Sequence, residues 1–155
     1  MSIEDDIAFL ERVPALAILG RDALRIIAIG SESRYVHEGN ALFGEGDDAD
    51  GAYVVQEGSF ELASKKNGRI APAVVARGAL IGELALLTES KRPVTAVARE
   101  PSSVVRIPRQ LFLKTLEGYP DAAVRMRDAL AARSSQTAGE FARVRAGLGG
   151  GPARK

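Results

Sequence analysis

The chain has 155 residues, the size of one domain. Its 21 Lys and Arg residues nearly balance 20 Asp and Glu residues, so the net charge of +1 predicts no bulk polyanion as a partner. The chain contains no cysteine and a single histidine, His37, which excludes disulfides and thiolate metal centres and disfavours histidine-rich metal sites and Ser-His-Asp catalysis. We therefore expect a protein without a metal ion, a cofactor or an enzymatic activity.

The charges are unevenly distributed along the chain. Residues 1–60 carry 4 basic and 12 acidic residues, whereas residues 61–155 carry 17 basic and 8 acidic residues. An anion-binding site is therefore expected in the second part. The first ten residues lack the basic flank and apolar stretch of a signal peptide, and nowhere do about 18 apolar residues run together. These features predict a cytoplasmic protein that has no membrane contact.

Two short helices are predicted before the first strand. Ser2 and Asp5 have the spacing of a capping box at the start of the first helix. Pro14 interrupts the helical pattern, and a second helix is expected over residues 22–28, with Gly30 as its stop signal. Both helices present an apolar stripe to a core.

Short apolar or alternating stretches recur over residues 32–108, separated by Gly, Asp, Asn and Lys. The predicted strands are Arg34–His37, Ala41–Phe43, Ala52–Gln56, Phe60–Ser64, Ile70–Val75, Val94–Ala98 and Val104–Pro108. Glu57-Gly58 and the stretch 65–68 read as hairpin turns. Seven or eight strands without long intervening helices indicate an antiparallel sandwich or barrel. Residues 82–87 are the exception, because they favour a short helix.

The helical pattern returns after Pro108. Gly118 ends one helix, Pro120 begins the next, and a long helix rich in Ala and Arg is expected over residues 121–148. The glycines that follow predict a flexible tail over 149–155. The chain is thus an α+β protein with a single domain over 1–148, in which a β-roll (about 32–108) is followed by C-terminal helices (about 109–148).

The segment over residues 78–96 carries the chemistry. Glu83 begins a helix of barely one turn after Gly82, which leaves the first backbone N–H groups unpaired, and such a terminus attracts anions. Arg92 follows nine residues later, with a guanidinium suited to phosphate, and Lys91 lies beside it. This set predicts a site for a phosphate next to a sugar hydroxyl. A structural salt bridge between Glu83 and Arg92 explains the same spacing equally well.

This segment resembles a known family. Gly82-Glu83-Leu84-Ala85-Leu86-Leu87, followed by Arg92 and Val94-Thr95-Ala96, is similar to the phosphate-binding cassette of cyclic nucleotide-binding domains, and the resemblance covers about residues 20–120. It implies an antiparallel double-stranded β-helix, a jelly-roll-like β-roll with flanking helices. It also implies a non-enzymatic sensor that binds cAMP or cGMP and signals through its C-terminal helices.

The resemblance assigns a role to each matching residue. Glu83 accepts a hydrogen bond from the ribose 2′-hydroxyl, and Arg92 pairs with the cyclic phosphate, assisted by the backbone N–H groups of Leu84 and Ala85. Gly82 permits close approach of the ligand. The full set of expected ligand contacts is Ile81, Gly82, Glu83, Leu84, Ala85, Arg92, Pro93 and Val94, with Ile81 and Leu84 on the sugar side.

Pro93 departs from the family pattern, because many relatives carry Ala, Ser or Thr after the arginine. Proline has neither an N–H nor a hydroxyl, and the loss of one charge-assisted bond to the phosphate costs about 1.5–3 kcal/mol, one to two decades of affinity. The missing hydroxyl favours cAMP over cGMP, bound with modest affinity. The alternative is a β-roll without a ligand that acts as an interaction module through its C-terminal helix.

The C-terminal helix suggests further partners. A seam at alternating spacings of four and three comprises Leu130, Ser134, Thr137, Phe141, Val144 and Leu148. It is typical of a homodimer interface, or of a helix that packs back on the roll. Arg125, Arg127 and Arg133 lie where relatives place a lid over the base, although solvated charges are the simpler interpretation. No recognition helix follows, so we expect no DNA partner and an effector protein of unknown identity.

Overall fold

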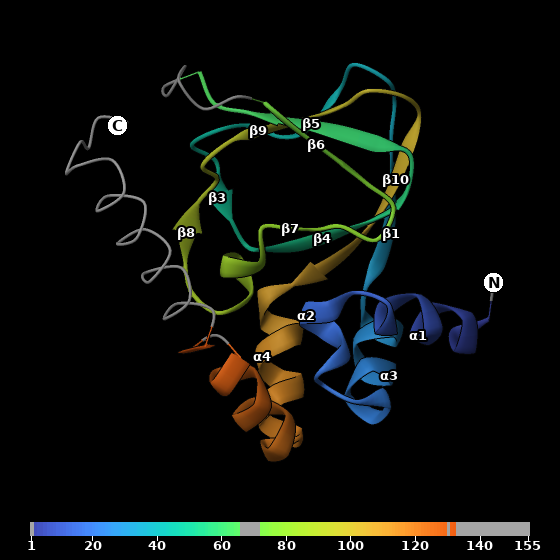
Figure 1. The fold of residues 1–155 in the computed structure, drawn as a ribbon, viewed down its shortest axis with the longest axis vertical. Helices are drawn as coiled ribbons and strands as arrows, with labels where there is room; N and C mark the ends of the chain where they lie inside the picture. Colours follow the sequence, from blue (N-terminus) through green and yellow to red (C-terminus); the bar gives the residue numbers. More distant parts are fainter. Residues whose placement is uncertain (1, 66–71, 130, 133–155) are drawn as a thin grey trace, which may run out of the picture.

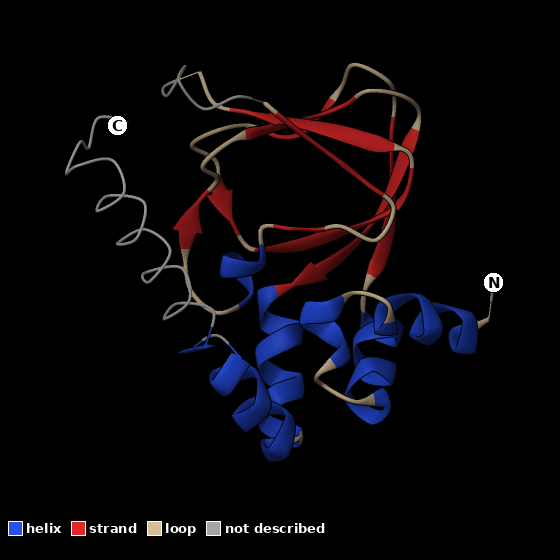
Figure 2. Cartoon of the chain, viewed as in Figure 1, coloured by secondary structure: helices blue, strands red, loops and turns tan. Residues whose placement is uncertain are grey.

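A β-roll stacked on a layer of helices makes up the fold of the computed structural model, which describes residues 2–65, 72–129 and 131–132 (Figure 1). Figure 2 shows the strands in red enclosing the roll, with the longer helices in blue gathered at one end. The helices are α1 (Ile3–Glu11), α2 (Pro14–Ala17), α3 (Arg21–Gly30), the 3₁₀ helix η1 (Glu83–Leu86) and α4 (Arg109–Gly118). Residues 120–129 form a further helix after α4.

In the described part of the chain, ten strands form two four-stranded antiparallel sheets and one two-stranded ladder. The first sheet has the order β1-β10-β4-β7, the second has the order β2-β9-β5-β6, and the ladder pairs β3 with β8. The strands are β1 (Glu32–Val36), β2 (Ala41–Phe43), β3 (Asp48–Ala49), β4 (Gly51–Glu57), β5 (Ser59–Ala63), β6 (Ala73–Ala76), β7 (Leu80–Ile81), β8 (Ser90–Lys91), β9 (Thr95–Ala98) and β10 (Ser102–Pro108). The predicted α+β class and β-roll are confirmed.

Three of these strands were not predicted. The strands β3, β7 and β8 have two residues each, which is too short to show the alternation by which strands are recognised. Each exists because a longer element or a neighbouring loop places its partner beside it: β7, for example, pairs with the central part of β4.

The N-terminal capping box is confirmed: the Asp5 N–H donates to Ser2 Oγ at 3.1 Å and the Ser2 N–H donates to Asp5 Oδ2 at 3.3 Å. Three helices stand where two were predicted, because Pro14 begins the extra turn of α2 instead of only interrupting the pattern. Gly30 is the last residue of α3 and not its stop, since the next residue, Ser31, closes the helix with an N–H bond of 2.9 Å to Ile27 O.

The hairpin predicted at Glu57-Gly58 is wrong. The strands on either side, β4 and β5, belong to different sheets, so the turn is a corner of the roll. Gly58 has φ 87°, and a Cβ on it would lie 2.8 Å from the Cα of Ser102. Ser102 Oγ in turn accepts a 3.1 Å bond from the Ser59 N–H. The second predicted hairpin joins β5 and β6, which do pair antiparallel, although residues 66–71 of its turn lie outside the described residues.

Two apolar cores stabilise the fold. One joins the helices to the first sheet and contains the buried side chains of Leu24, Ile27, Leu86, Ile107 and Phe112. The other fills the roll and contains Phe43, Tyr53, Val55, Phe60 and Ile81. Ile81 and Leu86 flank the residues 82–85, so the segment that carries the predicted chemistry crosses from one core to the other.

The structure describes only the first part of the predicted C-terminal helix. Helical structure is present over residues 120–129 and at 131–132. The rest of the predicted helix to residue 148, the seam residues from Leu130 onward and the tail 149–155 lie outside the described residues. Within the described part of the chain, no helix combines the length and the apolar character that crossing a membrane requires.

Candidate functional site

Arg92 lies inside the roll with a relative exposure of 4%. Its main chain is fixed by the loop before β3: the Arg92 N–H donates to Asp47 O, and the Gly46 N–H donates to Arg92 O, both at 2.8 Å. Its side chain donates from Nη2 to the carbonyl oxygen of Gly51 at 2.8 Å. The arginine is therefore held from two sides, by the β3–β8 ladder and by the start of β4.

Two aromatic rings cover one side of the guanidinium. The Cζ atom of Arg92 lies 4.4 Å from the ring centroid of Phe43, at the end of β2, and 5.5 Å from that of Tyr53 in β4. The two rings are stacked, with centroids 5.9 Å apart and planes inclined by 26°. These residues were missed at the sequence level, because an aromatic residue in a buried strand is first read as core.

The charge of Arg92 is incompletely compensated. Its Nε is buried and has no hydrogen-bond partner, and among the described residues no carboxylate forms an ion pair with it. Burial lowers the pKa of the Arg92 guanidinium, while Tyr53 and Asp50 oppose that shift. A buried cation without a counter-ion is costly, and an anion relieves that cost. The alternative salt bridge between Glu83 and Arg92 is not formed.

Gly82 lies against this guanidinium. Its backbone has φ 79° and ψ 35°, in the left-handed region, and a Cβ on it would lie 2.4 Å from Arg92 Nη1. Glycine is thus required both for the turn that begins η1 and for the space that Arg92 fills. The close approach of a ligand predicted for Gly82 stays a prediction.

The short helix predicted after Gly82 is present as η1, but its first amides are not all unpaired. The Ala85 N–H donates to Gly82 O at 3.0 Å, because in a 3₁₀ helix each N–H bonds to the carbonyl oxygen three residues earlier. Leu84 is 63% exposed, whereas Ile81 is buried in the roll. The sugar-side contacts predicted for these two residues stay a prediction. Glu83 is half-buried at the edge of an apolar hollow that Leu80 and Met126 also line.

The residues beside Arg92 differ in their surroundings. Pro93 is exposed, and Val94 is half-buried against the core of the roll. Lys91 pairs with Asp48 across the β3–β8 ladder. This contact lowers the pKa of the Asp48 carboxyl and raises the pKa of the Lys91 ammonium. Lys91 thus stabilises the ladder on its exposed side instead of joining Arg92 in the roll.

Arg109, the first residue of α4, is a further residue that the sequence did not single out. Its Nη1 donates to three carbonyl oxygens, those of Ala49 at 2.8 Å, Ala85 at 3.0 Å and Thr88 at 3.2 Å. Its N–H donates to Asp50 O at 2.7 Å. Main-chain acceptors have no sequence signature, so these bonds could not be predicted from the sequence. They connect the start of α4 to β3, to η1 and to the loop after η1.

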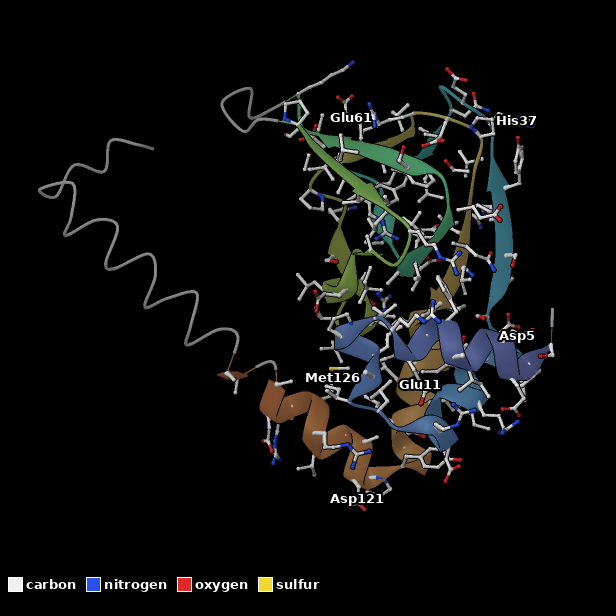
Figure 3. All side chains as sticks on the ribbon, turned by 45° about the vertical axis from the view of Figure 1, so that its right-hand side comes forward. Asp5, Glu11, His37, Glu61, Asp121 and Met126 are labelled. Carbon is white, nitrogen blue, oxygen red and sulfur yellow. The ribbon has the colours of Figure 1, made fainter. Side chains whose placement is uncertain are left out.

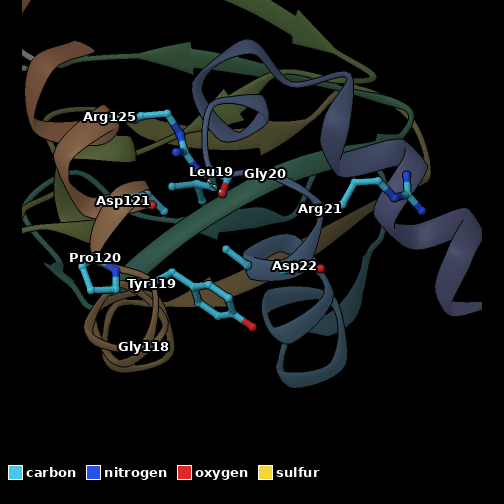
Figure 4. Close-up of a pocket in the computed structure, with 11 residues that line it drawn as sticks. Leu19, Gly20, Arg21, Asp22, Gly118, Tyr119, Pro120, Asp121 and Arg125 are labelled. Atoms are coloured by element: carbon cyan, nitrogen blue, oxygen red, sulfur yellow. Dashed lines mark hydrogen bonds between the residues drawn. The ribbon is translucent and has the colours of Figure 1, made fainter.

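A second hollow, of about 350 Å³, lies between the start of α3 and residues 118–125 (Figure 4). Arg125 extends across it and donates to Ile18 O at 2.5 Å and Leu19 O at 3.0 Å. Arg125 is exposed, as expected of a solvated charge, but it also links its own helix to the turn between α2 and α3. Arg127 is 75% exposed and lies 3.6 Å from Asp128, and Arg133 lies outside the described residues.

His37 lies at the end of the roll remote from the helices (Figure 3). It is exposed, and its ring meets Tyr35 edge-on with centroids 4.6 Å apart. The described residues contain no group of three His, Cys, Asp or Glu side chains that could hold a metal ion.

Comparison with known proteins defines the family. A model of the cyclic nucleotide-binding domain matches residues 33–119, which is more than half of the chain and includes nearly all of the roll and α4. The chain belongs to the cyclic nucleotide-binding domain family.

The relatives place this domain in larger proteins. The chain is 35% identical over 100 residues to a lysophospholipase of Neurospora crassa, covering 63% of this chain and 7% of the relative. It is 31% identical over 108 residues to the cAMP-dependent protein kinase regulatory subunit of Yarrowia lipolytica, covering 70% of this chain and 28% of the relative. The chain thus corresponds to a small part of each of these relatives.

Two solved structures are also similar. A cyclic nucleotide-binding-like protein from Brucella abortus is 33% identical, with a TM-score of 0.62, and the match covers 73% of this chain and 98% of that protein. The N-terminal domain of a transcriptional regulator from Streptomyces coelicolor is 28% identical, with a TM-score of 0.75, and the match covers 86% and 94% of the two chains.

Proposed function

We propose that this chain is a regulatory sensor that binds cAMP in preference to cGMP and performs no chemistry on it. One observation carries the proposal: the Arg92 guanidinium is buried, bears an unpaired Nε and has no carboxylate partner among the described residues. A cyclic phosphate supplies the missing charge and an in-plane acceptor for that N–H.

The remaining ligand contacts follow from the family. Glu83 accepts a hydrogen bond from the ribose 2′-hydroxyl. The Leu84 N–H donates a hydrogen bond to the phosphate that Arg92 binds. The preference for cAMP rests on Pro93, which offers neither a hydroxyl nor an N–H. Two backbone donors that the family uses on the phosphate are therefore not available: Pro93 has no N–H, and the Ala85 N–H already bonds to Gly82 O. The affinity for the nucleotide is correspondingly modest.

Signalling proceeds through the helices after β10. Leu86 of η1 and Phe112 of α4 lie in the same apolar core, and Arg109 bonds to the carbonyl of Ala85 at 3.0 Å. A ligand that reorders η1 therefore acts directly on α4. In this proposal, an effector protein in the cytoplasm receives the change, and neither DNA nor a membrane is a partner. The proposal also includes a homodimer formed through the predicted seam of the C-terminal helix.

The specific alternative is an interaction module that binds no nucleotide. The engaged Ala85 amide and the missing amide at Pro93 favour it, because both reduce the donors available to a phosphate. It predicts that Arg92 tolerates substitution without any loss of function.

Calorimetric titration with cAMP and with cGMP tests the proposal. The wild type binds cAMP more tightly than cGMP, and Arg92→Ala lowers the affinity for cAMP about 100-fold or more, since at least one charge-assisted contact is lost. Arg99→Ala, which removes an exposed arginine at the end of β9, leaves the affinity unchanged. Absence of heat with either nucleotide at millimolar concentrations overturns the proposal and leaves the fold intact.

A further inference from the structure

A continuous stack of side chains leads from the buried arginine to the surface. Arg92 lies over Phe43, Phe43 is stacked on Tyr53, and the Cζ atom of Arg34 lies 5.6 Å from the centroid of the Tyr53 ring. Arg34 Nη1 also donates to the Tyr53 hydroxyl at 3.2 Å. Two cations thus flank one pair of rings.

The stack draws on strands of both four-stranded sheets. Phe43 ends β2 in the second sheet, Tyr53 lies in β4 of the first sheet, and Arg34 comes from β1 at that sheet's edge. Phe43 and Tyr53 are 9% and 5% exposed. The rings therefore bridge the two sheets from inside the roll, where their positions are set by both.

The electrostatics give the rings a role beyond filling space. An aromatic face carries partial negative charge and attracts a guanidinium, most strongly where water is excluded. An aliphatic side chain of similar size fills the volume but supplies no such attraction. The guanidinium is planar, so a ring against its face leaves the N–H groups at its edge, where they can bond to an anion.

We propose that Phe43, supported by Tyr53, is a positioning residue that holds the Arg92 guanidinium oriented for an anionic ligand. The inference rests on the proposed function, because the anion is the phosphate of the nucleotide. Gly51 O fixes Nη2 at 2.8 Å, Phe43 covers one face, and the unpaired Nε is left for the ligand.

The test compares Phe43→Leu and Phe43→Tyr with Phe60→Leu in cAMP titrations. Phe60 is a fully buried residue of the same core, so Phe60→Leu matches the change in volume and the loss of packing. Phe43→Leu lowers the affinity for cAMP about tenfold, the effect of losing a desolvated cation–π contact. Phe43→Tyr and Phe60→Leu stay within about threefold of the wild type. Equal affinities for Phe43→Leu and Phe60→Leu overturn the proposal.

A second measurement separates this proposal from the proposed function. The unfolding free energies of the nucleotide-free wild type, Phe43→Leu, Arg92→Met and the double variant form a cycle that reports the coupling of the two side chains. Non-additive effects support the contact between ring and guanidinium even where the wild type binds no nucleotide, an outcome that removes the proposed function alone. Additive effects overturn the role of Phe43.

Discussion

The Arg109 guanidinium donates a hydrogen bond of 3.0 Å to the carbonyl oxygen of Ala85, so the first residue of α4 is bonded directly to η1. The same Nη1 also reaches Ala49 O and Thr88 O. This contact joins the helix that begins the C-terminal part of the fold to the segment that carries the candidate site. The candidate site and α4 are therefore in direct contact, with no layer between them.

Arg109→Met removes this connection. We expect the free energy of unfolding to fall by about 1–3 kcal/mol, because carbonyl groups lose a charged donor. We also expect the α4 amides to lose any cAMP-dependent change in hydrogen exchange, while the affinity for cAMP changes little. Lys114→Met, which removes an exposed cation from the same helix, keeps the exchange response. A response of normal size in Arg109→Met contradicts this coupling.

Gly82→Ala is expected to damage the site more than the fold. The substitution strains a backbone with φ 79° and places a Cβ 2.4 Å from Arg92 Nη1, so Arg92 must move. The matched control is Gly39→Ala, at φ 86° with no atom within 4 Å of its Cβ. Both variants lose about 1–2 kcal/mol of stability in urea unfolding, but only Gly82→Ala lowers the affinity for cAMP, by about tenfold or more. Equal affinities in the two variants refute the steric argument.

Pro93→Ala restores an N–H beside Arg92. Since a charge-assisted hydrogen bond contributes about 1.5–3 kcal/mol, we expect tighter cAMP binding by one to two decades in a calorimetric titration. Pro101→Ala removes another exposed proline, in the turn before β10, and leaves the affinity as it is. If Pro93→Ala binds no more tightly than this control, the missing amide does not limit the affinity.

The exposed pair Asp48–Lys91 predicts a pH dependence of stability. The lowered pKa of Asp48 means that its contribution is present above about pH 4 and is lost as pH falls through the lowered pKa. The raised pKa of Lys91 means that its contribution is present below about pH 10 and is lost as pH rises through the raised pKa. The small difference in Tm between the wild type and Lys91→Met should therefore be confined to the range between these limits. A difference that persists at pH 2 is inconsistent with an ion pair.

Local signals predicted well those features that depend on neighbouring residues. The capping box at Ser2, the single helical turn after Gly82 and the end of α4 at Gly118 each follow from residues a few positions apart. Arg92 was identified because its offset from Glu83 matches a family pattern. Its burial was not predictable, since it depends on the β3–β8 ladder and on Phe43 and Tyr53 from separate sheets.

Features that depend on long-range pairing were missed. Gly58 looks like a hairpin turn locally, but β4 pairs with β10 and β5 pairs with β9. The roll therefore turns a corner there. Arg109 bonds to main-chain oxygens, which every residue type provides, so no residue pattern indicates its partners.

The central claim is that a cyclic phosphate supplies the hydrogen-bond acceptor and the negative charge that the buried guanidinium of Arg92 lacks. The most direct test is the NMR resonance of the Arg92 Nε–H group. The spectrum is recorded for the free protein and with saturating cAMP, and is assigned with the Arg92→Lys variant. The claim predicts a downfield shift and slower exchange of this proton with cAMP, and neither change with adenosine, which lacks the phosphate. A resonance that stays unchanged while cAMP is bound contradicts it.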